Sequence, residues 1–193
     1  MSRIAYLHGF NSGPESAKGR TLGRAIAALP AATRPEFFLP RLSHRPAEAM
    51  RTASQWAESA ARAELTFVGS SLGGFYATRL AEMHGAKAVL VNPAIAPERT
   101  LAPYLGRQRN PSTGEEYEFT TTHLAELSTL RVERVTRPGR YLLLAQAGDE
   151  LLDWRQTVAF YAGAWQFIQG GGDHAYADFV LQVPLVLHFA GVA

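Results

Sequence analysis

The spacing of hydrophobic and polar positions changes repeatedly along the chain. Short apolar runs that stop at glycine or proline predict buried strands at residues 3–9, 36–40, 64–70, 86–93, 140–148 and 165–172. Apolar residues at helical spacing predict helices at residues 15–30, 46–63, 72–85, 154–164 and 174–191. We expect the last helix to be broken near Pro184. This alternation favours an α/β fold, with about six mostly parallel strands covered by helices on both faces.

One connection between the predicted strands is unusually long. More than forty residues separate Pro93 from Gly139, whereas an ordinary crossover needs far fewer. We therefore predict that residues 94–137 form an inserted cap, part loop and part helix, beside the C-terminal edge of the sheet. The length of 193 residues suits a single domain, 1–193, that includes this cap.

Composition narrows the class of protein. There is no cysteine, which excludes disulfides and thiolate metal sites and fits a reducing, cytoplasmic compartment. We find no signal peptide and no apolar window long enough for a membrane span. The formal net charge is +2 and the arginines are scattered, with no basic stripe interleaved with aromatics, so we expect no nucleic-acid partner.

The segment TFVGSSLGGFYATRLA, residues 66–81, carries the clearest chemical signal. An apolar run ends at Gly69 and a helical pattern follows, which is the context of the G-x-S-x-G turn that exposes a nucleophilic serine. Such a sharp turn has no room for side chains two residues before and after the serine. Ser71 has Gly69 and Gly73 there, whereas Ser70 would have bulky neighbours. We predict Ser71 as the nucleophile; the alternative is a glycine-rich turn without chemistry.

A serine hydroxyl needs a base, and in enzymes with this turn the order along the chain is serine, acid, histidine. His174 follows the last predicted strand, and the three glycines at 170–172 would let the backbone carry its imidazole over the sheet edge. The remaining histidines lie in less suitable places, and we expect them to be surface or hydrogen-bonded residues: His8, His44, His84, His123 and His188.

The acid of such a triad should follow the strand before the histidine. Asp149 lies in the first turn past that strand, where it could accept from the imidazole and stabilise its charged form. Glu150 and Asp153 are alternatives, although Asp153 also has the place of a helix N-cap. Asp173 adjoins the histidine and would point away from it.

An oxyanion formed at the serine would need two donors. The amide of Leu72, at a helix N-terminus, is one. His8-Gly9-Phe10 resembles the His-Gly entry loop of hydrolases, which makes the Phe10 amide the second, and the Asn11 side chain could add a third. The same loop lacks the spacing of a phosphate-binding loop, and there is no dinucleotide fingerprint. We expect no metal and no organic cofactor.

Four segments together resemble the YqiA-type small bacterial esterases, a branch of the α/β-hydrolase superfamily. They are YLHGFNSGPESAKG, VGSSLGGFYAT, VLVNPAIAP with YLGRQRNPSTGEEY, and GDELLDWRQTVAFYAGAWQFIQGGGDHAY. The resemblance spans nearly the whole chain. It implies an α/β-hydrolase fold and an intracellular carboxylic ester hydrolase acting on acyl thioesters or short acyl esters. By motif match it implies Ser71 as nucleophile, Asp149 as acid and His174 as base.

The expected reaction is a two-step acyl transfer on a small-molecule ester or thioester. Apolar residues of the cap could line an acyl pocket or could simply pack against the domain: Leu101, Tyr104, Leu105, Tyr117 and Phe119. Two other functions remain open from the residues alone. One is a non-catalytic binding module on the same scaffold, and the other is an acyltransferase or amidase that uses the same triad.

Overall fold

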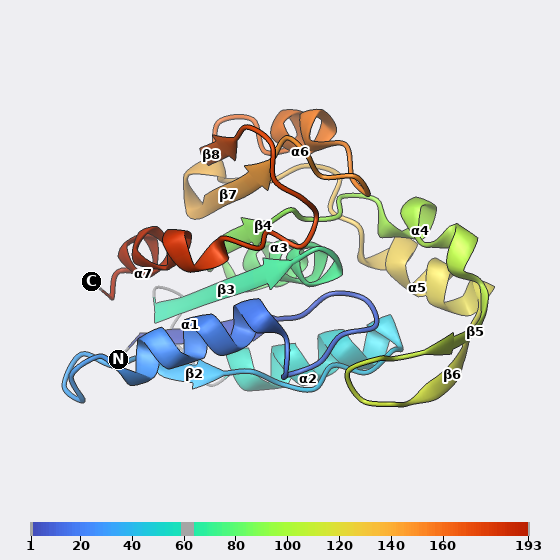
Figure 1. Ribbon diagram of the computed structural model, residues 1–193, viewed down its shortest axis with the longest axis horizontal. Helices are drawn as coiled ribbons and strands as arrows, with labels where there is room; N and C mark the ends of the chain where they lie inside the picture. The colour runs from blue at the N-terminus through green and yellow to red at the C-terminus, as the bar shows by residue number, and fades with distance from the viewer. Residues whose placement is uncertain (1, 59–63, 193) are drawn as a thin grey trace.

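A computed structural model describes residues 2–58 and 64–192, so the end of the helix predicted over 46–63 lies outside the described residues. Its centre is a six-stranded sheet in the order β2-β1-β3-β4-β7-β8, and every neighbouring pair is parallel (Figure 1). The prediction of about six mostly parallel strands is therefore confirmed. The strands are β1 (Arg3–Leu7), β2 (Glu36–Phe38), β3 (Leu65–Ser70), β4 (Lys87–Val91), β7 (Tyr141–Gln146) and β8 (Trp165–Gln169).

Helices cover both faces of this sheet, because alternate side chains of the buried strands need apolar partners on each side. On one face, α1 (Ala17–Ala27) and α7 (Val183–Ala190) pack against a cluster that includes Tyr6 and Val68. On the other, α2 (Pro46–Ala57) and α3 (Leu72–His84) pack against a cluster that includes Leu7 and Phe67, and α6 (Trp154–Phe160) lies on the same side. Figure 1 shows α1 and α7 in front of the strands.

Local signals set several helix ends. Gly85 ends α3 in the left-handed conformation, with φ 62°, as the sequence pattern indicates. Pro46 lies at the start of α2, where its missing N–H has no consequence. The helix predicted over 174–191 is shorter than expected: residues 174–178 form turns, and a 3₁₀ turn, η4 (Phe179–Gln182), leads directly into α7. Pro184 lies in the first turn of α7 rather than at a break within a longer helix.

The segment between β4 and β7 contains more regular structure than the expected mixture of loop and helix. It consists of α4 (Pro97–Thr100), η2 (Ala102–Tyr104), β5 (Gly106–Arg109), β6 (Glu116–Phe119), α5 (Thr121–Leu130) and η3 (Pro138–Arg140). The antiparallel hairpin of β5 and β6 was not expected from the sequence. Its first strand, GRQR, has no apolar side chain. The second, EYEF, does alternate polar and apolar residues and buries Phe119, so it carried a strand signal that was not used.

Strand order determines where a site can form. β1 and β3 are neighbours, but the chain continues from β1 toward β2 and from β3 toward β4, in opposite directions across the sheet. The loops that follow β1 and β3 therefore separate and leave a crevice at the carboxyl ends of the strands. Within residues 2–58 and 64–192, no helix combines the length and the apolar character needed to cross a membrane.

Candidate active site

Ser71 lies at the corner between β3 and α3, in a backbone conformation that side chains rarely adopt. Its φ is 56° and its ψ is −122°. A Cβ on Gly69 would lie 2.1 Å from the carbonyl oxygen of Gly73, and a Cβ on Gly73 would lie 1.9 Å from the carbonyl oxygen of Leu7. Only glycine fits at either position, so the two glycines allow the main chain to turn tightly enough to expose Ser71. Ser70, by contrast, is the buried last residue of β3.

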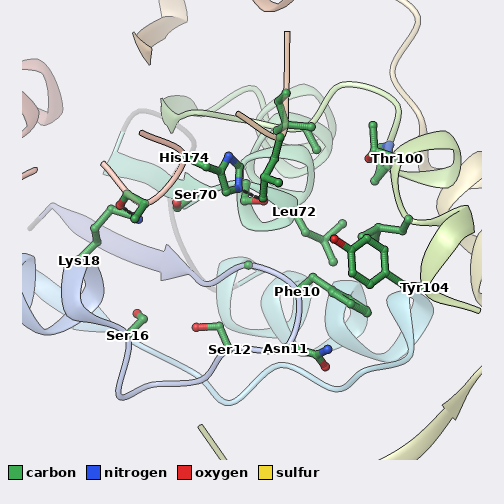
Figure 2. Close-up of a pocket in the computed structure, with 18 of the residues that line it drawn as sticks. Phe10, Asn11, Ser12, Ser16, Lys18, Ser70, Leu72, Thr100, Tyr104 and His174 are labelled. Atoms are coloured by element: carbon green, nitrogen blue, oxygen red, sulfur yellow. Dashed lines mark hydrogen bonds between the residues drawn. The ribbon is translucent and has the colours of Figure 1, made fainter. Parts of the chain in front are cut away.

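The structure brings three of the sequence-predicted residues into one hydrogen-bonded chain. The His174 Nε2 lies 3.0 Å from the Ser71 Oγ, and its Nδ1 lies 2.8 Å from the Asp149 Oδ2. Figure 2 shows the His174 ring above the corner at which Leu72 begins α3. The imidazole therefore contacts the serine hydroxyl with one nitrogen and a carboxylate with the other, as in the hydrolase triads.

The other carboxylates near the histidine have different partners. Asp153 caps α6, where its Oδ1 accepts from the Arg155 amide at 3.0 Å. The Glu150 Oε2 accepts from the main-chain amide of His174 at 2.9 Å rather than from its ring. Of the candidate acids, Asp149 is thus the one whose carboxylate contacts the imidazole.

Electrostatics keep Asp149 ionised. Burial acts to raise the pKa of this carboxyl, but the hydrogen bond with His174 and those from the amides of Leu152 and Leu151 outweigh burial. Both amides donate to the Asp149 Oδ1 at 2.9 Å. The net result is a pKa below the usual value of an aspartate, so at neutral pH the group can stabilise a charged imidazole.

Asn92, which the sequence analysis did not single out, supports the loop that carries His174. Its side-chain amide donates to the carbonyl oxygens of Asp173, at 2.9 Å, and His174, at 3.2 Å. Its Oδ1 accepts from the Gln146 amide at 2.9 Å, so one side chain joins β4, β7 and this loop. The sequence signal that could have identified it is its place directly after a buried strand and before Pro93. In the structure its φ is 41°, a conformation that asparagine adopts more readily than most residues.

The loop after β1 lies beside the serine, as an oxyanion loop must. A Cβ on Gly9 would lie 3.3 Å from the Ser71 Cβ, so Phe10 begins close to Ser71. Leu72 is the first residue of α3, and its N–H is among those that have no acceptor within the helix. The two expected donors, Phe10 and Leu72, therefore both begin close to Ser71.

The side chain of Asn11 is engaged by the hairpin of β5 and β6. Its Nδ2 donates to the Gln108 Oε1 at 3.1 Å, and its Oδ1 accepts from the Tyr117 hydroxyl at 2.7 Å. Asn110 adds a third bond, from its Nδ2 to the carbonyl oxygen of Ser12 at 2.9 Å. Asn11 thus links the loop of residues 8–13 to the inserted segment, and it also lines the cavity. Its expected role as a side-chain donor to an oxyanion stays a prediction.

A cavity of about 570 Å³ opens at Ser71 and His174. One side is apolar and includes Phe10, Leu72, Leu101 and Tyr104. The other side is polar and includes Ser12, Ser16 and Lys18, while Asn11 lies next to Phe10 (Figure 2).

The remaining cap residues considered for an acyl pocket lie elsewhere. Phe119 is buried and packs edge-on against Phe10, with ring centroids 5.3 Å apart. Tyr117 stacks on His44, and Leu105 is exposed at 43%. Of the five, Leu101 and Tyr104 are those that line the cavity beside the serine.

Other histidines have partners that account for them. His8 is buried, accepts from the Leu42 amide at its Nε2 and lies 3.0 Å from the Gly9 carbonyl at its Nδ1. His123 closes the capping box of α5 with Thr120. In the part of the chain that the structure describes, no group of three or more histidine, aspartate or glutamate side chains is placed to hold a metal ion.

Comparisons with known proteins agree with this architecture. A family model described as "Uncharacterised protein family (UPF0227)" matches residues 3–191, which confirms the resemblance to the YqiA-like family. Mouse alpha/beta hydrolase domain-containing protein 10 superposes with a TM-score of 0.70 at 15% identity, covering 96% of this chain and 89% of that chain.

Two bacterial structures are similar to the same extent. Est1E from Butyrivibrio proteoclasticus gives a TM-score of 0.69 at 17% identity, covering 97% of this chain and 86% of that chain. The esterase domain of a Rhodothermus marinus protein gives 0.67 at 16% identity, covering 98% and 86%. At identities this low the likeness shows the fold, which is that of the α/β-hydrolases.

Proposed function

We propose that this chain, which belongs to the UPF0227 family, is a serine esterase that hydrolyses small carboxylic esters or acyl thioesters through an acyl-enzyme intermediate. One observation carries the proposal: a continuous hydrogen-bonded chain runs from Asp149 through His174 to Ser71, and Ser71 occupies a strained corner beside a cavity. The structural similarity to the esterase domain of the Rhodothermus marinus protein agrees with this reaction class.

In the first step Ser71 attacks the ester carbonyl. The His174 Nε2 takes the hydroxyl proton as the Oγ–C bond forms, and Asp149 stabilises the resulting imidazolium. The carbonyl oxygen becomes an oxyanion that accepts from the Phe10 and Leu72 amides. The N-terminal end of the α3 dipole adds to this stabilisation, because Leu72 is its first residue.

Collapse of the tetrahedral intermediate releases the first product. His174 returns its proton to the departing oxygen or sulfur, and the acyl group stays on the Ser71 Oγ. A water molecule then donates its proton to the same imidazole and attacks the acyl carbon. The second collapse releases the carboxylic acid and restores the serine, so every proton transfer passes through one histidine.

The same proposal gives the inserted segment, residues 94–137, the role of a cap that forms part of the substrate pocket. Residues 94–137 are part of one domain, 1–193, and Leu101 and Tyr104 line the acyl side of the cavity. Hydrogen bonds between the cap and the loop of residues 8–13 support that placement. The cysteine-free composition suits a cytoplasmic enzyme.

The two adjacent serines provide a matched test. Ser71→Ala should lower kcat for p-nitrophenyl butyrate by about 10⁴-fold or more, as removal of a triad nucleophile does. Ser70→Ala, one residue away, should cost far less, and a fluorophosphonate probe should label wild type and Ser70→Ala but not Ser71→Ala. Equal losses in both variants, or labelling that persists in Ser71→Ala, would rule out the assignment.

A further inference from the structure

Lys18 stands out on the polar side of the catalytic cavity. It lies in the first turn of α1 and lines the cavity with Ser12 and Ser16. The chain has only two lysines, Lys18 and Lys87, and a positive charge in the first turn of a helix opposes the helix dipole. The energetics of α1 therefore give no reason for a lysine at this position.

The ammonium of Lys18 has more N–H donors than it has hydrogen-bond partners among the described residues. Among residues 2–58 and 64–192, its single hydrogen-bond partner is the carbonyl oxygen of Ala175, and no carboxylate lies within ion-pair distance. Burial lowers the pKa of Lys18, and the charge of Asp173 opposes that effect without forming an ion pair. An ammonium offers three donors. Two of them can therefore meet a ligand in the cavity.

The contact with Ala175 indicates which part of a bound substrate would lie next to Lys18. Ala175 follows His174, the residue that must protonate the leaving oxygen or sulfur. The leaving group therefore lies on the His174 side of the cavity, toward Lys18. Figure 2 shows Lys18 and Tyr104 on opposite sides of His174, so the apolar side near Tyr104 is left for the acyl chain.

A second cavity gives the leaving group room beyond Lys18. It has a volume of about 970 Å³ and runs between α1 and the segment of η4 and α7. Three residues line both cavities: Ala17, Lys18 and Ala175. Lys18 thus lies where the two cavities meet, and the second one also has the cation of Arg24 in its lining.

We infer that Lys18 binds a carboxylate on the leaving-group side of the substrate, so that the preferred esters release an alcohol or thiol that carries an acidic group. The inference rests on the proposed esterase function and names the substrate class of the same site. The ammonium and the carboxylate form a partly buried, charge-assisted hydrogen bond, a stronger contact than a neutral one. A single ammonium matches a single carboxylate.

Two esters that differ in one group test this. They are the butyrate esters of 3-hydroxybenzoate and of 3-hydroxybenzamide. The para isomers form a second pair, in which the distance between the ester and the carboxylate or carboxamide is longer. Wild type should show a kcat/KM at least about tenfold higher for the carboxylate than for the carboxamide in one of the pairs. Lys18→Met should bring that ratio close to one.

Lys87→Met is the matched control. Lys87 also donates to a carbonyl, that of Phe189 at 2.8 Å, but it begins β4 at the end of the strand away from the cavity. This variant should keep the wild-type ratio. Thermal unfolding of both variants checks that each is folded.

The outcomes separate this inference from the proposed function. Equal kcat/KM for both esters in wild type, or a preference that persists in Lys18→Met, overturns it. Equal losses on both esters in Lys18→Met also overturn it, because they would assign the lysine to holding the His174 loop through Ala175. Two results would instead contradict the esterase proposal, and this inference with it. One is that wild type does not hydrolyse the carboxamide ester, and the other is that Ser71→Ala still hydrolyses it.

Discussion

The serine corner and the loop of residues 8–13, proposed above to hold the oxyanion, lie side by side at the cavity, but they are held in different ways. Ser71 is held by its main chain: its amide donates to the Val91 carbonyl at 3.0 Å, and its carbonyl accepts from the Ala94 amide at 3.1 Å. The loop of residues 8–13 is held by side chains, through Asn11 and through Asn110 of the inserted segment.

This difference indicates which substitutions the serine corner and the loop of residues 8–13 can each accommodate. The corner depends on backbone atoms in close contact, where an added methyl group cannot be accommodated. The loop depends on individual hydrogen bonds, each with a net contribution of about 1 kcal/mol. Substitutions at the corner should therefore act nearly all-or-none, and substitutions that weaken the loop should give partial losses. The predictions below follow that order.

The largest effect is expected from Gly73→Ala. The new Cβ would lie 1.9 Å from the carbonyl oxygen of Leu7, so β1 and the start of α3 would have to separate. We expect esterase activity to fall to background and the melting temperature to drop, or no soluble protein to form. Turnover of p-nitrophenyl butyrate measures the activity, and thermal unfolding followed by circular dichroism measures the melting temperature.

Gly139→Ala is the control for that substitution, since a Cβ there meets no atom within 4 Å among the described residues. It should leave activity and melting temperature close to wild type. A Gly73→Ala protein that is stable and active would show that the corner is less constrained than its contacts indicate.

Asp149→Asn should have the next largest effect. An asparagine keeps the shape but cannot stabilise the imidazolium, and the corresponding change in a serine protease lowers kcat by about 10⁴-fold. Steady-state kinetics measure the loss, with Asp153→Asn as the control because that carboxylate caps α6. A full rate in Asp149→Asn together with a loss in Asp153→Asn would transfer the role of acid to Asp153.

The same variant has a consequence for stability. Because the pKa of Asp149 is lowered in the folded state, its ionised form stabilises the fold at pH values above the unfolded-state pKa, near 3.9. That contribution is lost as the pH falls through the folded-state pKa. The difference in melting temperature between wild type and Asp149→Asn should narrow between pH 6 and pH 3, and a difference that widens would contradict the assignment.

The smallest effect is expected from Tyr117→Phe, which removes the hydroxyl that donates to the Asn11 Oδ1 at 2.7 Å. The oxyanion loop keeps its other two links, so kcat should fall only about three- to tenfold, with KM nearly unchanged. Tyr161→Phe removes a hydroxyl that lies 2.8 Å from Thr78, away from the cavity, and should lower stability without lowering kcat. Equal kcat in both variants would show that the cap does not position the loop.

Much of this architecture followed from local patterns. Buried strands appear as apolar runs whatever they pair with, so the six strands and the helices between them could be placed. Ser71 could be chosen over Ser70 because backbone crowding at a sharp turn is a local property, visible in the spacing of Gly69 and Gly73. His174 stood out because three glycines precede it after the last strand.

Contacts between distant segments were decided only by the tertiary structure. The sequence favoured Asp149 as the acid but left Glu150 and Asp153 open, and the folded loop shows which carboxylate contacts the imidazole. β5 has no apolar side chain to mark it as a strand, and the two hydrogen bonds between its hairpin and Asn11 span about a hundred residues. Local preference is set by a residue and its neighbours along the chain, whereas the partner of a polar side chain depends on which segments the whole sheet brings together.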